Sequence, residues 1–286
     1  MKNLLITGSG GFIGSYFIDK YKDNYNIKTF SFLNDNFNKL NLKDMDVVFH
    51  LSGLVHKMGG ASDKEYERVN VTQTLSLAKK AKEIGVKQFI FMSTVKVYGE
   101  ETNVAYRENS DCSPQDEYGK SKLKIELKLL KLESDTFKVS IIRTPVVYGY
   151  GVKANIKNLV NLVNKVPILP FGDIKNKRST VYIGNLCHLV DEIAVQEKPG
   201  IFLASDDNPF STTRLIELIA NGLNKKVYLV KIPLFESLLK LLKPSFHKRL
   251  YESLEVDNNA TKKMLSLVNP YSAEDGIKLM LKDYYQ

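Results

Sequence analysis

Tyr118 and Lys122 are the residues of this chain whose types and spacing best suit proton transfer. They stand four positions apart in the run 118–122 (YGKSK), so on a helix they share one face. A free tyrosine has a pKa of about 10, which is too high for efficient proton transfer near neutral pH. A lysine cation about 4 Å away would stabilise the phenolate by up to roughly 4 kcal/mol, or about three pKa units.

The Tyr–Lys spacing alone is a weak pattern, because about two such pairs are expected by chance in a chain of this composition. The other pair, Tyr16 and Lys20, falls in the first predicted helix away from any strand end, and we interpret it as structural. The first pair is distinguished by residues 92–95 (MSTV), which end a predicted parallel strand, where open α/β sheets bind their ligands. Thr94 would hold a substrate oxygen there while Tyr118 moves a proton and a hydride moves at the same carbon.

A glycine-rich loop at residues 8–14 (GSGGFIG) lies between a strand-like and a helix-like run, the context that a dinucleotide-binding fingerprint requires. Gly8, Gly11 and Gly14 would allow a tight turn, close approach of a pyrophosphate, and close packing of helix on strand. The helix N-terminus would offer N–H groups and a partial positive charge to the phosphates. The spacing departs from GxGxxG because position 13 is Ile, and a plain strand-to-helix turn is the alternative.

Residues 29–35 (TFSFLND) cover the region that selects between NAD and NADP. A carboxylate at the end of the second strand binds the ribose 2′-hydroxyl of NAD, whereas a nearby Arg accommodates the 2′-phosphate of NADP. No acid stands at the predicted strand end, although Asp35 lies just past it, and no Arg is near. The sequence leaves the choice between NAD and NADP open.

The elements that must position these residues alternate between strands and helices. Strands are predicted at 2–7, about 27–32, 46–51, 88–92, 139–142 and 200–204, and helices after the glycine loop, from 71 to a stop at Gly85, and at 118–132. Because the strands are apolar throughout, we predict an α/β fold with a doubly wound parallel (Rossmann) sheet. Residues 1–148 with 181–203 would form this domain, and 149–180 with 204–286 a smaller, mostly helical substrate lobe.

The composition excludes several other classes of protein. The 286 residues are 43% hydrophobic and 26% charged, as in ordinary soluble globular proteins. Cys112 and Cys187 form no CxxC or Cys/His cluster, so we expect neither a disulfide framework nor a metal site. No apolar run approaches the roughly 18 residues of a membrane span, and we expect a cytoplasmic protein. The net charge of +9 comes from lysines scattered through predicted helices rather than from a basic tail, so no nucleic-acid partner is expected.

Together these motifs resemble the extended short-chain dehydrogenases/reductases of the NAD-dependent sugar epimerase/dehydratase family. The resemblance runs nearly end to end, through residues 7–14, 50–53 (HLSG), 70–71 (NV), 93–99 (STVKVYG), 118–122, 143–149 (RTPVVYG) and 254–257 (LEVD). It implies that Thr94, Tyr118 and Lys122 are catalytic, and that Lys122 also binds the nicotinamide ribose. It further implies a site for NAD or NADP formed by Tyr118 and Lys122 with Gly8, Gly11, Phe12, Ile13, Gly14, Leu51, Ser52, Gly53, Asn70, Ser93 and Pro145.

Within the family, residues 93–100, 151–155 and 176–179 are most similar to bacterial 4-reductases and 4-epimerases of UDP-N-acetylhexosamines. This implies a UDP-sugar substrate, with Asn155 and Arg178 on the diphosphate and Thr94 and Lys96 also in the substrate site. A helix cap is the alternative for Asn155, and a surface charge for Arg178. Two departures from the family stand out: Val268-Asn269-Pro270 replaces the usual Trp-x-Pro, and the chain after the second strand is short.

The leading hypothesis is a reductase, in which a UDP-4-keto-6-deoxy-N-acetylhexosamine takes a hydride at C4 while Tyr118 donates the proton. The first alternative is a 4-epimerase of a UDP-sugar of the UDP-glucose or UDP-GlcNAc type. It would use the same three residues, Thr94, Tyr118 and Lys122, here called the trio. A catalytically silent dinucleotide sensor is the remote alternative, and the intact trio argues against it.

Three further residues are interpreted as structural, and one pair of helices is expected to contact a second copy of the chain. His50 ends a predicted buried strand and is expected to hydrogen-bond neighbouring backbone; His56 and Cys187 are also interpreted as structural. A homodimer is expected, since family members pair two helices into an intersubunit bundle. Its apolar stripes here would be Leu75/Ala78 and Leu123/Leu127/Leu130, unless both stripes simply cover the sheet.

Overall fold

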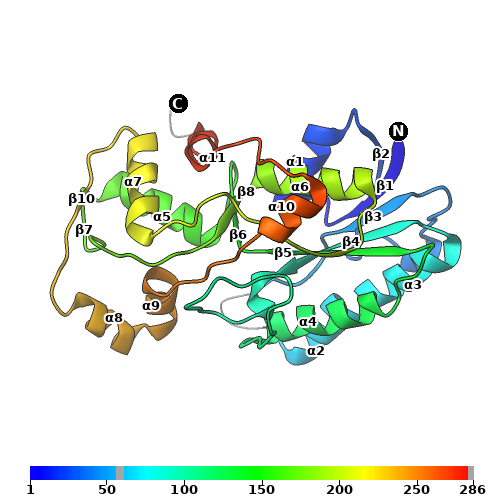
Figure 1. Ribbon diagram of the computed structural model, residues 1–286, viewed down its shortest axis with the longest axis horizontal. Helices are drawn as coiled ribbons and strands as arrows, with labels where there is room; N and C mark the ends of the chain where they lie inside the picture. Colours follow the sequence, from blue (N-terminus) through cyan, green and yellow to red (C-terminus); the bar gives the residue numbers. More distant parts are fainter. Residues whose placement is uncertain (56–60, 283–286) are drawn as a thin grey trace.

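The computed structural model describes residues 1–55 and 61–282 and is built around one parallel sheet (Figure 1). The sheet has six strands in the order β2-β1-β3-β4-β5-β9, which confirms the predicted doubly wound fold. Its strands are β1 (Lys2–Thr7), β2 (Tyr25–Phe30), β3 (Val47–His50), β4 (Gln88–Thr94), β5 (Lys138–Thr144) and β9 (Gly200–Leu203). The second strand lies two residues earlier than predicted, because its register against β1 pairs Lys2 with Tyr25 and Thr7 with Phe30.

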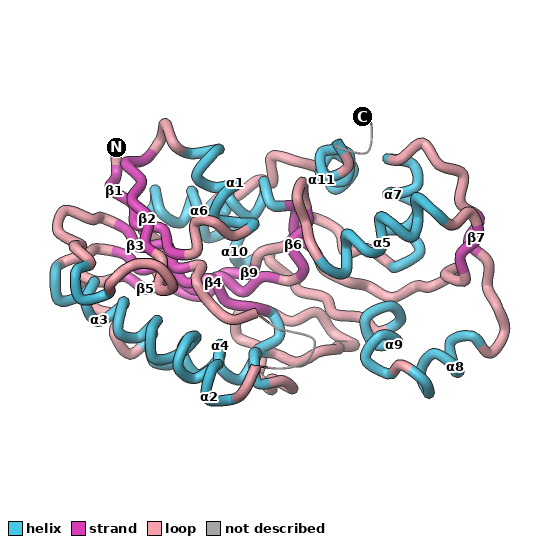
Figure 2. The backbone as a smooth tube through the Cα atoms, turned by 180° about the vertical axis from the view of Figure 1, so that it is seen from behind, coloured by secondary structure: helices cyan, strands magenta, loops and turns pink. Residues whose placement is uncertain are grey.

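Helices cover both faces of the sheet (Figures 1 and 2). One face carries α1 (Phe12–Tyr21), α6 (Ile183–Gln196) and α10 (Asn259–Leu265); the other carries α2 (Asp63–Tyr66), α3 (Thr74–Ile84) and α4 (Glu117–Leu130). The alternation of side chains along β1 explains the two layers: Leu4 and Ile6 belong to the core with Phe17 of α1, whereas Leu5 belongs to the core with Leu77 of α3. An apolar strand is therefore buried on both sides, as the sequence predicted.

A smaller assembly of short elements lies beyond the carboxyl ends of the strands (Figure 1). It contains two parallel strand pairs, β6 (Val146–Tyr148) with β8 (Thr180–Tyr182) and β7 (Ile168–Leu169) with β10 (Tyr228–Leu229). Its helices are α5 (Ala154–Lys165), α7 (Thr212–Gly222), α8 (Phe235–Leu242), α9 (Pro244–Tyr251) and α11 (Ala273–Met280). Within the described residues, no helix combines the length and the apolar character needed to cross a bilayer.

The two apolar stripes expected at a subunit interface are largely used inside the chain. Ala78 is fully buried in the core under α3, so the structure contradicts its placement at an interface. Leu75 and Leu130 pack against the same core, and Leu123 packs against the cluster around Tyr98. Leu127 is exposed, with 54% of its surface accessible. The homodimer stays a prediction, and Leu127 is the stripe residue that a partner would meet.

Candidate active site

The predicted site residues gather where the strand order reverses. β1 pairs with β2 on one side and with β3 on the other, and open α/β sheets bind ligands in the crevice outside the carboxyl ends of such strands. The glycine loop follows β1, residues 51–53 follow β3, Thr94 ends β4 and Pro145 follows β5. Four neighbouring strands thus bring these residues to one edge of the sheet.

The glycine loop has the geometry that a pyrophosphate requires. Gly8 has a φ of +71°, in the left-handed region that favours glycine, and the N–H of Gly11 donates to the Gly8 carbonyl at 3.0 Å. A Cβ on Gly14 would lie 2.5 Å from the Gly8 oxygen, so only glycine lets the helix approach the strand this closely. Phe12 begins α1, and no side chain caps that helix N-terminus. The loop therefore fits the phosphates of a dinucleotide.

The loop after β3 is held by two buried polar residues. The N–H of Ser52 donates to the Thr7 hydroxyl at 3.2 Å. Asn70, which is 1% exposed, accepts from the Leu54 N–H at 2.7 Å and donates to the Leu54 carbonyl and the Ser121 hydroxyl, both at 3.0 Å. The structure thus gives the Asn70 amide a positioning role between this loop and α4. Asn70 belongs to a π-helical turn, Glu67–Gln73, which the sequence did not predict and which is a common feature of functional sites.

Thr94, Tyr118 and Lys122 come together as the sequence predicted. Asp116 caps α4 by accepting from the Gly119 N–H at 2.7 Å, which fixes Tyr118 in the first helical turn. The Tyr118 side chain lies beside Thr94 at the end of β4, close enough for Thr94 to affect its pKa. One turn further along α4, the Lys122 ammonium donates to the Met92 carbonyl at 2.9 Å and lies 5.9 Å from the centre of the Tyr118 ring.

The charges in this trio differ from those expected. Burial raises the pKa of Tyr118, the nearby Asp116 carboxylate raises it further, and Thr94 opposes both. Burial also lowers the pKa of Lys122 to about 8. The expected lowering of the Tyr118 pKa by Lys122 is therefore wrong for this arrangement, because the ammonium is directed to the Met92 carbonyl of β4 rather than to the phenol. In this arrangement Tyr118 is a neutral phenol at neutral pH, and it must ionise before it can take a proton from a substrate hydroxyl.

The structure contains a buried ion pair, between Arg143 and Glu126, that was not predicted from the sequence. Arg143 of β5 makes a two-pronged contact with Glu126 of α4, at 2.7 Å from Nη2 and 3.1 Å from Nε to the same oxygen. Their side chains are 5% and 1% exposed. The Ser93 hydroxyl also donates to Glu126, so the side chain of Ser93 is used within the protein rather than offered to a cofactor. The sequence did contain an indication that Glu126 shares the environment of Lys122, because Glu126 follows Lys122 by four residues on the same face of α4.

The histidine at the end of β3 is structural, but its partners were not predicted. His50 is 1% exposed, and its two ring nitrogens lie 2.8 Å from the hydroxyls of Thr7 and Thr74. The prediction of backbone partners is wrong, because both ring nitrogens are paired with side-chain hydroxyls, from β1 and α3. Burial lowers the His50 pKa to about 3, so the ring is neutral. His56 lies outside the described residues.

The remaining structural interpretations agree with the structure. Cys187 is completely buried in the core beneath α6. Tyr16 packs against that core near Tyr182, while Lys20 is exposed, so the second Tyr–Lys pair is interpreted as structural. His188 and two carboxylates of α6 group their ligand atoms within 4.8 Å. Tyr25 and Gln196 hydrogen-bond those carboxylates, and we interpret the group as structural.

The other three predicted substrate residues, Lys96, Asn155 and Arg178, lie in different surroundings. The Lys96 ammonium sits between Asp116, at 2.5 Å, and Glu100, at 3.0 Å. Arg178 is half-buried, and its Nη1 donates to the Lys248 and Glu252 carbonyls of the α9 region at 3.4 and 3.0 Å. Asn155 is exposed in the first turn of α5.

Arg178 is a half-buried cation with charges of both signs nearby. Burial lowers its pKa, although it remains a cation. Among residues 1–55 and 61–282, no carboxylate oxygen lies within 4.0 Å of its guanidinium. Glu100 and Glu252 lie close enough to stabilise its charge, whereas Arg249 opposes it, so an anionic ligand at Arg178 stays a prediction.

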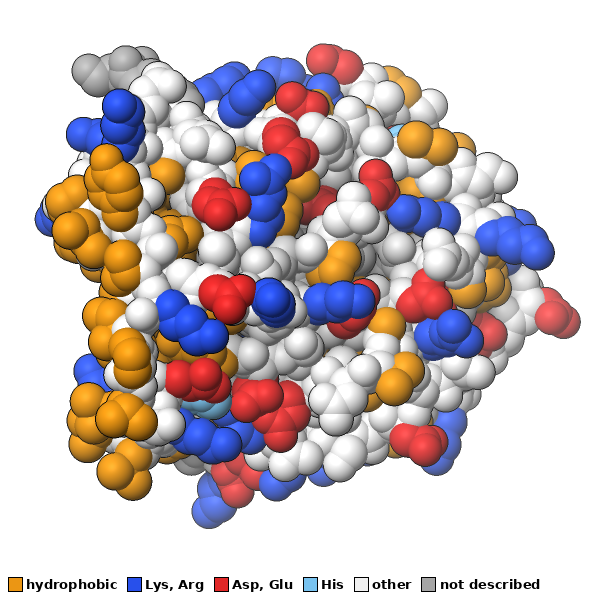
Figure 3. Space-filling model, turned by 60° about the vertical axis from the view of Figure 1, so that its left-hand side comes forward, with side chains coloured by type: hydrophobic (Ala, Val, Ile, Leu, Met, Phe, Trp, Pro, Cys, Tyr) orange, Lys and Arg blue, Asp and Glu red, His pale blue; other side chains and the backbone are white. Residues whose placement is uncertain are grey.

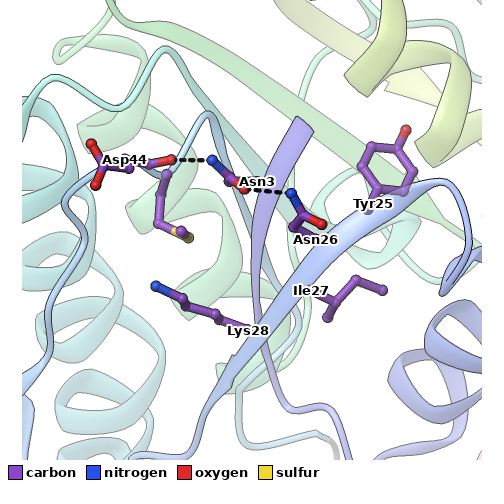
Figure 4. Close-up of a pocket in the computed structure, with 7 residues that line it drawn as sticks. Asn3, Tyr25, Asn26, Ile27, Lys28 and Asp44 are labelled. Carbon is purple, nitrogen blue, oxygen red and sulfur yellow. Dashed lines mark hydrogen bonds between the residues drawn. The ribbon is translucent and has the colours of Figure 1, made fainter. Parts of the chain in front are cut away.

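An open hollow of about 500 Å³ lies at the other end of the sheet (Figure 4). Asn26 donates to Asn3 at 3.0 Å, and Asn3 donates to the Asp44 carbonyl at 2.7 Å. These residues begin or precede β1, β2 and β3 rather than following them. Because ligands of such sheets bind at the carboxyl ends of the strands, we place the active site at the trio and not in this hollow.

Comparisons with known proteins agree with this geometry. Residues 4–204 match the NAD dependent epimerase/dehydratase family. The UDP-glucose 4-epimerase of Vibrio cholerae is 35% identical, over 100% of this chain and 96% of that protein. The UDP-glucuronic acid 4-epimerase of Bacillus cereus, solved with NAD, superposes with a TM-score of 0.79 at 21% identity over 99% of both chains. The UDP-N-acetylglucosamine 4-epimerase of Methanobrevibacter ruminantium M1, solved with UDP-N-acetylmuramic acid, gives 0.78 at 22% identity over 99% of this chain and 98% of that one.

Proposed function

Because the chain belongs to the NAD-dependent epimerase/dehydratase family, we propose that it epimerises a UDP-sugar at C4, with NAD as its cofactor. One observation carries the proposal: Tyr118, in the first turn of α4, lies beside Thr94 at the end of β4, with Lys122 one helical turn away. The full-length similarity to a UDP-glucose 4-epimerase favours epimerisation over the 4-keto reduction expected from the sequence.

The trio can carry out both halves of an epimerisation. NAD held at the glycine loop would supply the acceptor and the donor of the hydride that leaves C4 and returns to it on the opposite face. As the phenolate, Tyr118 would take the proton of the C4 hydroxyl while C4 is oxidised to a carbonyl, and as the phenol it would give that proton back while C4 is reduced from the opposite face. Thr94 donates a hydrogen bond to the same oxygen throughout. No net oxidation results, since the hydride and the proton both return.

We assign the two parts of the fold to the two ligands. Residues 1–148 with 181–203 bind the cofactor, whose phosphates meet the glycine loop and the start of α1 at Gly8, Gly11, Phe12, Ile13 and Gly14. Residues 149–180 with 204–286 bind the sugar nucleotide. Residues 51–53, Asn70 and Pro145 line the cofactor side of the crevice, and Lys96, Asn155 and Arg178 face the substrate.

Product analysis separates the two possible reactions. The enzyme is incubated with UDP-glucose or UDP-N-acetylglucosamine and NAD, and products are resolved by anion-exchange chromatography and proton NMR. Epimerisation gives the C4 epimer with no net change in nicotinamide absorbance. Loss of NADH in equal amount to a consumed UDP-4-keto-6-deoxy-N-acetylhexosamine would instead show a reductase. Absence of both reactions would contradict the assignment of C4 chemistry.

The end of β2 supports NAD over NADP. Ser31 follows the strand, and its N–H donates to the Asp35 carboxylate at 2.8 Å. The Asp35 carboxylate therefore lies at the end of β2, where it would bind a ribose 2′-hydroxyl and repel a 2′-phosphate. Asp35→Asn is expected to reduce the preference for NAD over NADP by about tenfold. Calorimetric titration of both cofactors tests this, with Asp23→Asn as an exposed control; an unchanged affinity ratio would remove Asp35 from the cofactor site.

Arg178 is the residue through which we expect the UDP diphosphate to bind. Arg178→Ala should weaken both UDP and UDP-sugar by roughly 1.5–3 kcal/mol, mainly in KM, since the diphosphate is held alike in the ground and transition states. Arg178→Lys should already weaken binding, because an ammonium cannot reproduce a two-pronged contact.

The neighbouring Lys177, with 65% of its side chain exposed, provides the matched control. Lys177→Ala should leave UDP affinity within about twofold in calorimetry, and thermal melting of all three variants reports whether the contacts to α9 survive. Wild-type UDP affinity in a folded Arg178→Ala protein would defeat the nucleotide assignment of this loop while leaving the dehydrogenase chemistry in place.

A further inference from the structure

The positive charge of the chain is concentrated in one segment, residues 225–249. This segment has seven basic residues and one acidic residue, a net charge of +6, in a chain whose total is +9. The lysines are not gathered into a tail, as expected, but basic residues are denser in this segment than in the rest of the chain. The segment runs from β10 through α8 and α9, and its one acid, Glu236, lies 3.3 Å from the ring of His247. Lys231 and Lys248 pair with Asp173 and Glu101 from outside the segment, and the remaining basic residues create a local positive field.

The same segment carries an apolar surface that the chain does not cover. Leu234, Leu238, Leu241 and Leu242 follow one another at positions 0, 4, 7 and 8, the spacing of one helix face. Their exposed fractions are 81%, 53%, 79% and 67%. Phe235 packs its ring edge-on against Phe171, with ring centres 6.2 Å apart, and so attaches α8 to the protein.

Neighbouring residues enlarge this surface into a patch. Ile232 is 49% and Phe246 42% exposed, before and after α8. Figure 3 shows hydrophobic side chains gathered along the left edge of the molecule in that view, with Lys and Arg side chains around them. Figures 1 and 2 place α8 at the outer end of the molecule, far from the sheet. An exposed apolar patch of this kind marks an interaction site.

The charge decides which partner fits. A two-fold contact with a second copy would bring two segments of charge +6 face to face, which Coulomb repulsion disfavours. An apolar helix face flanked by lysines matches a bilayer interface that contains anionic lipids: leucines enter the acyl boundary, and ammonium groups remain among the phosphates. Lys231, Lys240 and Lys243 are all exposed beside the patch.

We propose that residues 225–249 dock the protein onto an anionic membrane surface, with the leucine face of α8 in the lipid. Arg178 donates to the Lys248 carbonyl of α9, so docking would bring the substrate lobe, rather than the sheet, close to the membrane. The proposal is independent of the sugar that the enzyme accepts.

The absence of Trp from the chain allows a direct test. Leu241→Trp introduces a single fluorophore on the proposed lipid face, and Val195→Trp introduces one at a 58% exposed position of α6. With vesicles of phosphatidylglycerol and phosphatidylcholine, the first variant should shift its emission to the blue and be quenched by brominated lipid. The second should do neither. Vesicles of phosphatidylcholine alone should bind at least about tenfold more weakly.

Substitutions on the native chain test the two components separately. Leu238→Ser/Leu241→Ser/Leu242→Ser and Lys231→Gln/Lys240→Gln/Lys243→Gln should each reduce cosedimentation with the anionic vesicles by at least about tenfold. The controls Val195→Ser/Val268→Ser and Lys20→Gln/Lys28→Gln/Lys79→Gln replace exposed residues elsewhere and should bind like wild type. Turnover of soluble UDP-sugar without vesicles should be unchanged in all four, which separates this test from that of the proposed function.

Three results would overturn the proposal. Wild-type protein that does not sediment with anionic vesicles has no such surface. Binding that survives the leucine substitutions would reflect net charge alone. A dimer that the leucine substitutions convert to monomers, seen by analytical ultracentrifugation, would show that a second copy covers the face.

Discussion

Tyr118→Phe is expected to lose nearly all turnover while keeping the fold and the affinity for NAD. The substitution removes one oxygen, the atom that exchanges a proton with the C4 hydroxyl, and leaves the ring in place beside Tyr66. A positioned acid–base group contributes roughly 10²- to 10⁴-fold to the rate. We therefore expect kcat to fall by at least about 100-fold, with KM for the UDP-sugar little changed.

The control for this prediction is the other Tyr–Lys pair. Tyr16→Phe also removes a phenol hydroxyl one helical turn before a lysine, but Tyr16 lies on α1 and packs against the core beside Tyr182. It should retain turnover and lose only some stability. If the Tyr118→Phe enzyme kept more than about a tenth of the wild-type rate, a loss under roughly 1.4 kcal/mol, Tyr118 would not be the proton-transfer group.

The sheet was predictable from the sequence because its strands are apolar on both faces. Residues 2–7 form β1 with the predicted bounds, and Gly85 ends α3 in the left-handed conformation, with a φ of 89°. The bounds of β2 were not predictable from its own residues. Its start at Tyr25 depends on pairing with Lys2 of β1, a contact between residues distant in the sequence.

The trio was predictable because each member has a residue type with known chemistry and a place at a strand end or helix start. The direction of the Tyr118 pKa was not, because it depends on where the Lys122 ammonium points. Nor was the use of the Ser93 hydroxyl, which depends on the depth at which Glu126 is buried. Residue spacing places side chains on a common face, whereas burial and orientation follow only from the packed structure.

The second large effect concerns stability rather than chemistry. Glu126→Ala is expected to lower the free energy of unfolding by about 3–5 kcal/mol, because it leaves the Arg143 guanidinium buried without its counter-charge. The Ser93 hydroxyl loses its acceptor at the same time. Urea unfolding followed by circular dichroism measures the change. Since β4, β5 and α4 meet at this pair, the Thr94–Tyr118 contact should loosen as well.

A matched pair and a double substitution distinguish buried charge from general damage to α4. Glu67→Ala breaks the exposed contact between Glu67 and Lys124, whose side chains are 45% and 52% exposed, and should cost at most about 1 kcal/mol. Replacing both buried partners, Glu126→Leu with Arg143→Met, removes the stranded charge and should recover most of the lost stability. If the double variant were no more stable than Glu126→Ala, the cost would lie in packing, and the ion pair would not be what Glu126 contributes. If Glu126→Ala cost as little as Glu67→Ala, water would have reached Arg143, and the pair would not be sealed between α4 and the sheet.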